Sequence, residues 1–296
     1  MSTTVSFFPF DLFGSRGAGA GAELLADAVR EMLADNKREQ LPTRARAYAG
    51  QVRLREFGFE TPAAYHDWRR QGRRAVRDAW KRGDFLCWMA GNHLGVLPVY
   101  DELSGDNDTL VVQFDAHLDV YHLSDCTSEL SHGNFLMHCA GPLPALVNLG
   151  HRELLLPPEH VGAYYRATFP ASALAVDPEP ALAYLRRAGG EASRVFLDLD
   201  CDVFDRAYFP AVAHPVPFGL SPHLLLRLLD AVWSERVVGL AVSEFDPARD
   251  SGDHCLATLV WLLEYLLLKR YEGRPATNAP PEGRKRLDRL SDGPSR

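Results

Sequence analysis

Three short segments of this 296-residue sequence concentrate acidic residues and histidines, although they lie far apart along the chain: 90–93, 115–119 and 200–205. Their side chains that could bind a metal ion are His93, Asp115, His117, Asp119, Asp200 and Asp202. The set is too large for one cation, and carboxylates with imidazoles and no thiolate suit a pair of divalent ions that share a bridging carboxylate. Water held between two such ions becomes a nucleophile near neutral pH. The residue types therefore predict a metal-dependent hydrolase.

Each segment follows an apolar run that is typical of a buried strand. The expected strands are 5–10, 85–89, 109–114, 145–149, 194–197 and 236–242, and the expected helices are 22–34, 61–80, 222–233 and 254–271. Strands that alternate with helices predict an α/β fold, a three-layer α-β-α sandwich with a mostly parallel sheet. Ligands collect at the carboxyl ends of the strands in such sheets, so all three segments are expected to meet at one site.

A glycine-rich segment, 14–21, separates the first expected strand from the first expected helix. Glycines at such a place could cradle a phosphate, but the segment lacks the Gly-Lys-Ser/Thr ending of a phosphate-binding loop. A tight strand-to-helix turn is therefore the better interpretation.

One catalytic domain is expected to span residues 1–271, followed by a polar tail at 272–296 that we expect to be flexible. Apolar residues make up 46% of the chain, and no apolar run reaches the ~18 residues of a membrane span. The five cysteines are odd in number and form no C-x-x-C pair, and the start of the chain lacks the basic residues of a secretion signal. These features favour a cytoplasmic protein with reduced thiols that does not bind a membrane. The sequence leaves open whether the chain forms a homo-oligomer.

Positive charge gathers in an expected basic helical insertion at 36–82, although the net charge of the whole chain is −7. The region holds thirteen lysines and arginines against five acidic residues. It forms either a solvated helix face or a docking surface for an acidic partner such as a peptide. Nucleic acid is not an expected partner, because the overall balance is acidic and no basic-aromatic binding motif is present.

The joint pattern resembles the ureohydrolase superfamily, which includes arginase and agmatinase and has an arginase/deacetylase-like fold. Its members carry a Gly-Gly-Asp-His element, an Asp-Ala-His-x-Asp element and an Asp-x-Asp-x-x-Asp element, followed by a glutamate near the last strand. The second and third elements are intact here, while Asn92 replaces the aspartate of the first. Glu244 matches the glutamate, and His132, 13 residues after Asp119, matches the proton-shuttling histidine. The resemblance covers roughly residues 85–250.

The resemblance implies a role for each of these residues. Asp115 and Asp200 would each bind both of two Mn(II) ions. His93 and Asp119 would complete the ligands of the first ion, and His117 and Asp202 those of the second. Asp119 would also orient the attacking water. Glu244 would bind a cationic guanidinium group, and His132 would protonate the departing amine, so that urea and a primary amine are released. Asp205 is expected to support the site without binding metal, and Cys201 to point away from it by strand alternation.

Two positions bear on the substrate. Arginases that act on free arginine place an asparagine two residues after the Asp-Ala-His-x-Asp element, where this sequence has Tyr121. Ser128 occupies the place of a second contact to the amino-acid end. A neutral aromatic residue cannot bind a carboxylate as an amide can. The sequence is most similar to the peptide arginases, which convert arginine side chains of ribosomal peptides to ornithine, and this resemblance implies an arginine-containing precursor peptide as substrate.

Other functions remain as alternatives. A small-molecule ureohydrolase would act on a small guanidino compound such as agmatine. A deacetylase-like enzyme shares the fold but uses one zinc ion, and a metal-binding scaffold would have no catalytic activity. His93 alone could be a histidine of the core, because its Gly-Asn-His context is imperfect. Metal analysis separates these alternatives, since two manganese ions per chain favour guanidine hydrolysis and one zinc ion favours a deacetylase.

Overall fold

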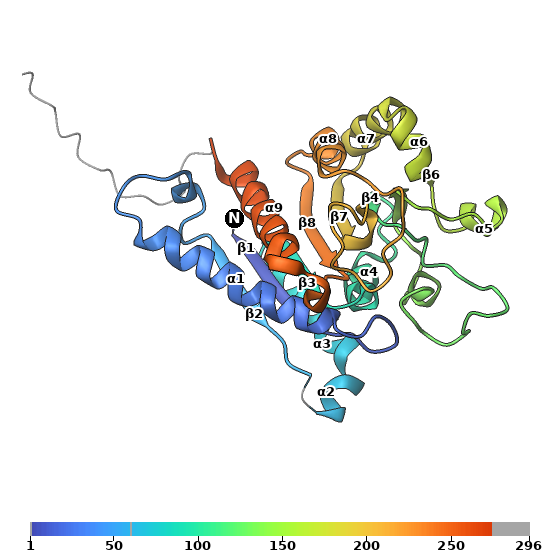
Figure 1. Ribbon diagram of the computed structural model, residues 1–296, viewed down its shortest axis with the longest axis horizontal. Helices are drawn as coiled ribbons and strands as arrows, with labels where there is room; N and C mark the ends of the chain where they lie inside the picture. Colours follow the sequence, from blue (N-terminus) through green and yellow to red (C-terminus); the bar gives the residue numbers. More distant parts are fainter. Residues whose placement is uncertain (1, 60, 274–296) are drawn as a thin grey trace, which may run out of the picture.

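The computed structural model describes residues 2–59 and 61–273. Its central element is an eight-stranded sheet (Figure 1). Its strands are β1 (Thr3–Phe8), β2 (Val52–Glu56), β3 (Phe85–Ala90), β4 (Thr109–Phe114), β5 (Ala145–Leu149), β6 (Ala167–Phe169), β7 (Arg194–Asp200) and β8 (Val237–Ser243). The strand order is β2-β1-β3-β8-β7-β4-β5-β6. Every pair of neighbouring strands is parallel, so the prediction of a mostly parallel sheet is confirmed.

Helices cover both faces of this sheet. They are α1 (Ala18–Arg38), α2 (Pro62–His66), α3 (Trp68–Lys81), α4 (Leu97–Leu103), α5 (Pro158–Gly162), α6 (Ala171–Val176), α7 (Glu179–Glu191), α8 (Pro222–Val232) and α9 (His254–Tyr271). One apolar cluster joins the sheet to α1 and α6–α9, and a second joins the other face to α2–α5. Successive residues of a strand point to opposite faces, and accordingly Cys87 belongs to the first cluster and Trp88 to the second. The three-layer sandwich is confirmed.

The glycine-rich segment forms the predicted strand-to-helix turn. Gly17 precedes α1 with φ of 101°, a left-handed conformation that glycine adopts without a steric penalty. A Cβ atom at Gly21 would lie 1.9 Å from the carbonyl oxygen of Phe245, so only glycine allows α1 to approach the end of β8 so closely. The turn therefore brings the start of α1 against the strand that leads into Glu244.

The basic region departs from the prediction of a continuous helix. The expected helix at 61–80 is interrupted at Asp67, whose backbone (φ −102°, ψ 3°) separates α2 from α3. The region also contains the edge strand β2, which was not among the expected strands, although its charged residues alternate with Val52 and Leu54 as in a half-buried strand. The expected domain at 1–271 covers most of the described residues. Residues 274–296 of the expected tail lie outside the described residues.

Ion pairs neutralise part of the basic region. Arg69 binds Asp101 with two hydrogen bonds of 2.6 and 2.7 Å, and Arg73 and Arg77 both bind Glu102 at 2.8 Å. These pairs fasten α3 to α4, which leads away from His93. Among the described residues, none of the helices combines the length and the apolar character that a membrane crossing requires.

Candidate metal centre

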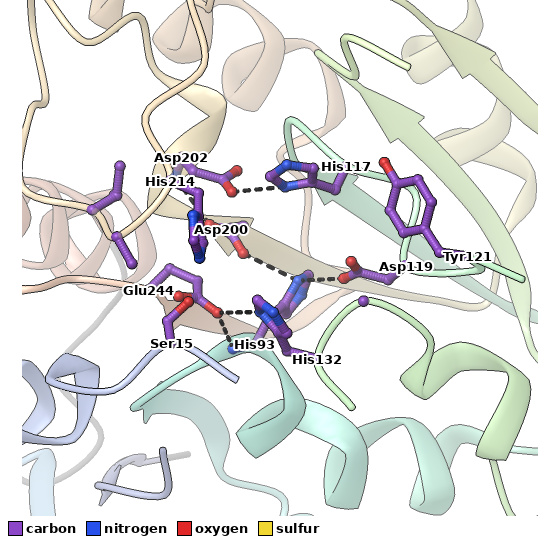
Figure 2. Close-up of a pocket in the computed structure, with 13 residues that line it drawn as sticks. Ser15, His93, His117, Asp119, Tyr121, His132, Asp200, Asp202, His214 and Glu244 are labelled. Atoms are coloured by element: carbon purple, nitrogen blue, oxygen red, sulfur yellow. Dashed lines mark hydrogen bonds and ion pairs between the residues drawn. The ribbon is translucent and has the colours of Figure 1, made fainter. Parts of the chain in front are cut away.

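A cavity of about 200 Å³ opens at the carboxyl ends of the central strands (Figure 2). His93 follows β3, the segment 115–119 follows β4, Asp200 ends β7, and Glu244 follows β8. The cavity is lined by Ser15, His93, His117, Asp119, Tyr121, His132, Gly133, Asp200, Asp202, Val212, Ala213, His214 and Glu244. The structure thus brings together side chains that the sequence separates by more than a hundred residues.

One group of candidate ligands surrounds the ring of His93, which is 2% exposed. The His93 Nδ1 atom lies 2.8 Å from Asp119 Oδ2. It lies 3.2 Å from Asp115 Oδ2 and 3.2 Å from Asp200 Oδ2. Although these atoms are buried and close together, His93 Nδ1, Asp115 Oδ2 and Asp119 Oδ2 have no hydrogen-bond partner. Buried donors and acceptors are normally satisfied, so their convergence fits a bound cation.

A second group is built around His117, which is partly exposed in the wall of the cavity. Its Nδ1 atom lies 2.9 Å from Asp202 Oδ2 and 3.8 Å from Asp115 Oδ1. His93, Asp115 and Asp200 each offer one ligand atom within 4.8 Å of the others, and so do Asp115, His117 and Asp202. Asp115 is common to both groups, which is the arrangement expected of a carboxylate that bridges two ions.

The electrostatics of this cluster also favour cations. Burial and the neighbouring charge of Asp119 raise the pKa of Asp115 to about 7. Burial and the charge of Asp202 likewise raise the pKa of Asp200 well above its usual range. Burial alone would lower the pKa of His117, but the carboxylates around it outweigh this effect and raise the pKa to about 10. So many acids can share one buried space only if protons or metal ions neutralise them.

Glu244 and His132 lie together on the opposite wall from His117 and Tyr121 (Figure 2). The Glu244 Oε1 atom accepts a hydrogen bond of 2.9 Å from the backbone N–H of His93 and lies 3.4 Å from His132 Nδ1. Burial would lower the pKa of His132, but the hydrogen bond and charge of Glu244 raise it above its ordinary value. Glu244 and Asp119 have left-handed backbones, with φ of 66° and 50°, as is common for residues held at functional sites.

Asp198 was not identified from the sequence, although it contacts a candidate ligand. Its Oδ2 atom lies 3.0 Å from His93 Nε2 and accepts a hydrogen bond of 2.6 Å from the hydroxyl of Tyr100. A carboxylate on this side of the ring orients Nδ1 toward the cavity. The sequence could have identified Asp198, because it lies two residues before Asp200 and residues two apart in a strand share a face.

Of the two residues expected to contact the substrate, Tyr121 lines the main cavity and Ser128 does not. Tyr121 lines the cavity, and burial together with the nearby carboxylate of Glu153, an acid that was not singled out from the sequence, raises the pKa of its hydroxyl. Ser128 is exposed and lines a neighbouring cavity, of which Tyr121 is also a wall. The structure therefore puts Ser128 outside the main cavity. His214, left unassigned by the sequence, lies in the cavity wall, where its ring is 6.2 Å from that of His132.

Three other residues lie around the site. Asp205 accepts backbone hydrogen bonds from Ala207 and Gly219, and so shapes the 205–220 loop that supplies part of the cavity wall. Cys201 is buried in the apolar cluster beneath α1 and α6–α9, which agrees with the prediction that it points away. Asn92 donates a hydrogen bond of 3.0 Å to the carbonyl of Leu12 and thereby ties the His93 segment to the glycine-rich turn.

The sequence of this chain is similar to sequences of known proteins. A sequence model described as "Arginase: Arginase family" matches residues 2–268. The chain is 31% identical over 175 residues to the N(1)-aminopropylagmatine ureohydrolase of Thermus thermophilus, covering 56% of this chain and 57% of that protein. It is 30% identical over 198 residues to the agmatinase of Photorhabdus laumondii, covering 65% of this chain and 62% of that protein. These matches span little more than half the length of the curated relatives.

The fold has close counterparts among solved structures. The arginase of Bacillus subtilis superposes with a TM-score of 0.74 at 18% identity, over 93% of this chain and 100% of that one. At such low identity the likeness concerns the fold, which is the same three-layer sandwich.

Proposed function

The chain belongs to the arginase family, and from this premise we propose that it hydrolyses a guanidino group to urea and a primary amine with the aid of two Mn(II) ions. The observation that carries the proposal is the convergence of two histidines and four aspartates on one cavity, in two groups that share Asp115. Oxygen-rich sites with imidazole and no thiolate suit Mn(II). Two divalent ions bound there would supply Lewis acidity and a nucleophile derived from water near neutral pH.

Three residues of the chain would bind the substrate, orient the attacking water and donate a proton. Glu244 presents a carboxylate to the cavity and would fix the permanently charged guanidinium group above the metal centre. Asp119, whose Oδ2 atom has no hydrogen-bond partner, would accept a hydrogen bond from the attacking water and orient it. His132 would donate a proton to the departing amine nitrogen, since its raised pKa favours the protonated form.

We propose an arginine side chain within a peptide as the substrate, with ornithine as the product. The Glu153 carboxylate is close enough to influence the Tyr121 hydroxyl, so the position that would hold the amino-acid end of free arginine is occupied by an aromatic ring with a carboxylate near it. This pair offers no donor to an α-carboxylate and repels its charge. In a peptide the same group is a neutral amide, which avoids the repulsion.

A second candidate substrate is a small guanidino compound with a cationic tail, such as agmatine. The Glu153 carboxylate favours this candidate, because it would attract an ammonium group at the other end of the molecule. The names of the curated relatives, agmatinase and N(1)-aminopropylagmatine ureohydrolase, point the same way.

One assay separates these candidates. Urea release would be measured with added Mn(II) on an arginine-containing peptide, on free arginine and on agmatine, with mass spectrometry to detect ornithine in the peptide. Peptide turnover without turnover of the small molecules supports the peptide proposal, and turnover of agmatine alone replaces it with the second candidate. Metal analysis of the same sample should give two manganese ions per chain, whereas one zinc ion would indicate deacetylase-like chemistry.

The pH dependence of kcat/KM tests the role of His132. Because Glu244 raises the pKa of His132 above the ordinary 6.5, the histidine is protonated and can act as an acid below that raised pKa, and loses this ability as pH rises through it. We therefore expect activity to rise as the metal ligands lose protons and then to fall in a limb centred above pH 6.5. His132→Gln should be slower and should lack the falling limb. A falling limb that persists in this variant would assign the proton donor elsewhere.

Glu153→Gln tests the basis of substrate selection. Removing the charge next to Tyr121 should lower KM for free arginine by roughly 3- to 10-fold, as expected for relief of one partly solvated like-charge contact. The same change should raise KM for agmatine and leave KM for a neutral peptide nearly unchanged. Steady-state kinetics on the three substrates measure this, with Glu129→Gln as a matched control on the exposed part of the preceding loop. Equal changes for all three substrates would contradict a charge-based selection.

A further inference from the structure

Six large apolar side chains are exposed in segments that follow the carboxyl ends of β1, β4, β5 and β7, which is the end of the sheet where the cavity opens. We refer to them as the apolar rim: Phe13, Met137, Leu154, Leu155, Tyr208 and Phe218. The most exposed are Leu154 at 92%, Phe218 at 81% and Leu155 at 73%. Single exposed apolar residues are ordinary on protein surfaces, but a group of them at one site marks an interaction surface.

Two segments connect the rim to the cavity wall. The carbonyl of Phe13 accepts a hydrogen bond of 3.0 Å from the backbone N–H of His132. Leu154 and Leu155 directly follow Glu153, whose carboxylate influences the hydroxyl of Tyr121 in the cavity wall. The rim residues therefore belong to segments that contact the cavity wall through their backbone or an adjacent residue.

Phe218 lies on the 205–220 loop, which supplies Val212, Ala213 and His214 to the cavity wall. The loop is held on both sides of Phe218. Arg152 donates a hydrogen bond of 3.3 Å to the carbonyl of Val216, and the backbone N–H of Gly219 donates one of 3.1 Å to Asp205. The exposed ring of Phe218 is thus presented by an anchored loop.

The backbone at the rim is unusual for such bulky residues. Phe13 and Phe218 have φ of 57° and 60°, in the left-handed region that seldom accommodates an aromatic residue. The other non-glycine residues with positive φ in the described chain are Asp119, Glu244 and Asp253, of which the first two line the cavity. The loops hold these two rings toward solvent in the same uncommon conformation as the cavity residues, which favours a functional role for the rings.

We propose that the apolar rim binds the apolar residues on either side of the target arginine in a peptide. This inference rests on the proposed hydrolysis of a guanidino group and specifies its substrate class. The acidic cavity complements the guanidinium charge, while none of the rim residues is among those that line the cavity. A polypeptide has both parts, a cationic side chain that enters the cavity and neighbours that remain at the mouth.

The test compares substrates that differ only outside the cavity. They are a peptide with leucine and phenylalanine beside the arginine, the same peptide with serines at those positions, and N-acetylarginine amide. The double variant Phe13→Asn, Phe218→Asn removes both rings, and asparagine tolerates the left-handed backbone. Leu41→Asn, at a residue that is 76% exposed and lies far from the rim in sequence, is the matched control.

We expect the double variant to raise KM for the apolar peptide by about 10-fold, the effect of losing partial burial of two aromatic rings. Its KM for the serine peptide and the capped arginine should stay the same, and Leu41→Asn should change none of the values. If wild-type KM does not depend on the flanking residues, or if the double variant affects all three substrates equally, the rim is not a peptide-binding surface.

Binding and self-association are measured in parallel. Isothermal titration with the two peptides should show a weaker Kd for the apolar peptide in the double variant, whether or not any substrate is turned over. Preference for the apolar peptide without urea release would refute the proposed hydrolysis and retain the rim. An oligomeric wild type that becomes monomeric in the double variant, by sedimentation, would assign the rim to a second copy of this chain and overturn the proposal.

Discussion

Replacing His117 by alanine is expected to abolish urea release and to lower the metal content of the purified protein. The imidazole faces Asp202 and Asp115 in the second ligand group, so its loss removes a nitrogen ligand and leaves carboxylates that repel one another. Metal-ion catalysis supplies several kcal/mol of stabilisation to the transition state, and losing it reduces kcat/KM by about 10³-fold or more. Steady-state kinetics and elemental analysis of the dialysed protein measure the two effects.

The position of His117 makes this variant a fair test of the site. The residue is partly exposed and belongs to neither apolar cluster, so the alanine variant should keep its fold, which circular dichroism can check. His254→Ala is the matched control, because His254 is exposed at the start of α9 and does not line the cavity. Two ions per chain and normal turnover in the His117 variant would exclude His117 as a ligand.

The Glu244→Gln variant should retain its metal ions and lose affinity for the guanidinium group. Glutamine keeps an oxygen that can accept the 2.9 Å hydrogen bond from the His93 backbone, so the local structure should persist while the negative charge disappears. Truncating one partner of a buried ion pair costs about 2–5 kcal/mol, which corresponds to a loss of kcat/KM of roughly 30- to 4,000-fold.

Two readouts keep this prediction specific. The metal content of the Glu244 variant should equal that of the wild type, unlike that of the His117 variant. Substrate binding should weaken for every guanidino compound alike, because all of them place the same group opposite Glu244. Unchanged KM and kcat, with the fold and the metal retained, would remove Glu244 from the site.

Much of the fold follows from patterns that are local in the sequence. The central strands β3, β4 and β7 are buried on both faces and therefore read as continuous apolar runs, and α9 was predicted with the boundaries that it has. The parallel arrangement then requires their carboxyl ends to meet, which is why residues as distant as His93 and Asp200 could be expected together. The convergence of the candidate ligands depends on the parallel topology of the sheet, and the alternation of strands and helices in the sequence was enough to infer this topology.

The parts that were missed depend on contacts that no local pattern encodes. β2 and β6 lie at the sheet edges and are too polar or too short to resemble buried strands. Glu153 approaches Tyr121 only because the loops after β4 and β5 fold against each other. Ser128 sits in the same long loop after β4, where its position depends on tertiary packing, and the structure places it in a neighbouring cavity.

The strand order has a consequence for how the protein is made. β8 lies between β3 and β7, so until it is inserted the sheet consists of two halves, β2-β1-β3 and β7-β4-β5-β6, each with an unpaired edge. His93 belongs to one half and Asp115, His117 and Asp200 to the other. The candidate ligands therefore cannot all converge in a growing chain until β8, the last strand in the sequence, has been inserted between the two halves. Until then each half exposes an unpaired strand edge, at which a partly folded chain is prone to aggregate.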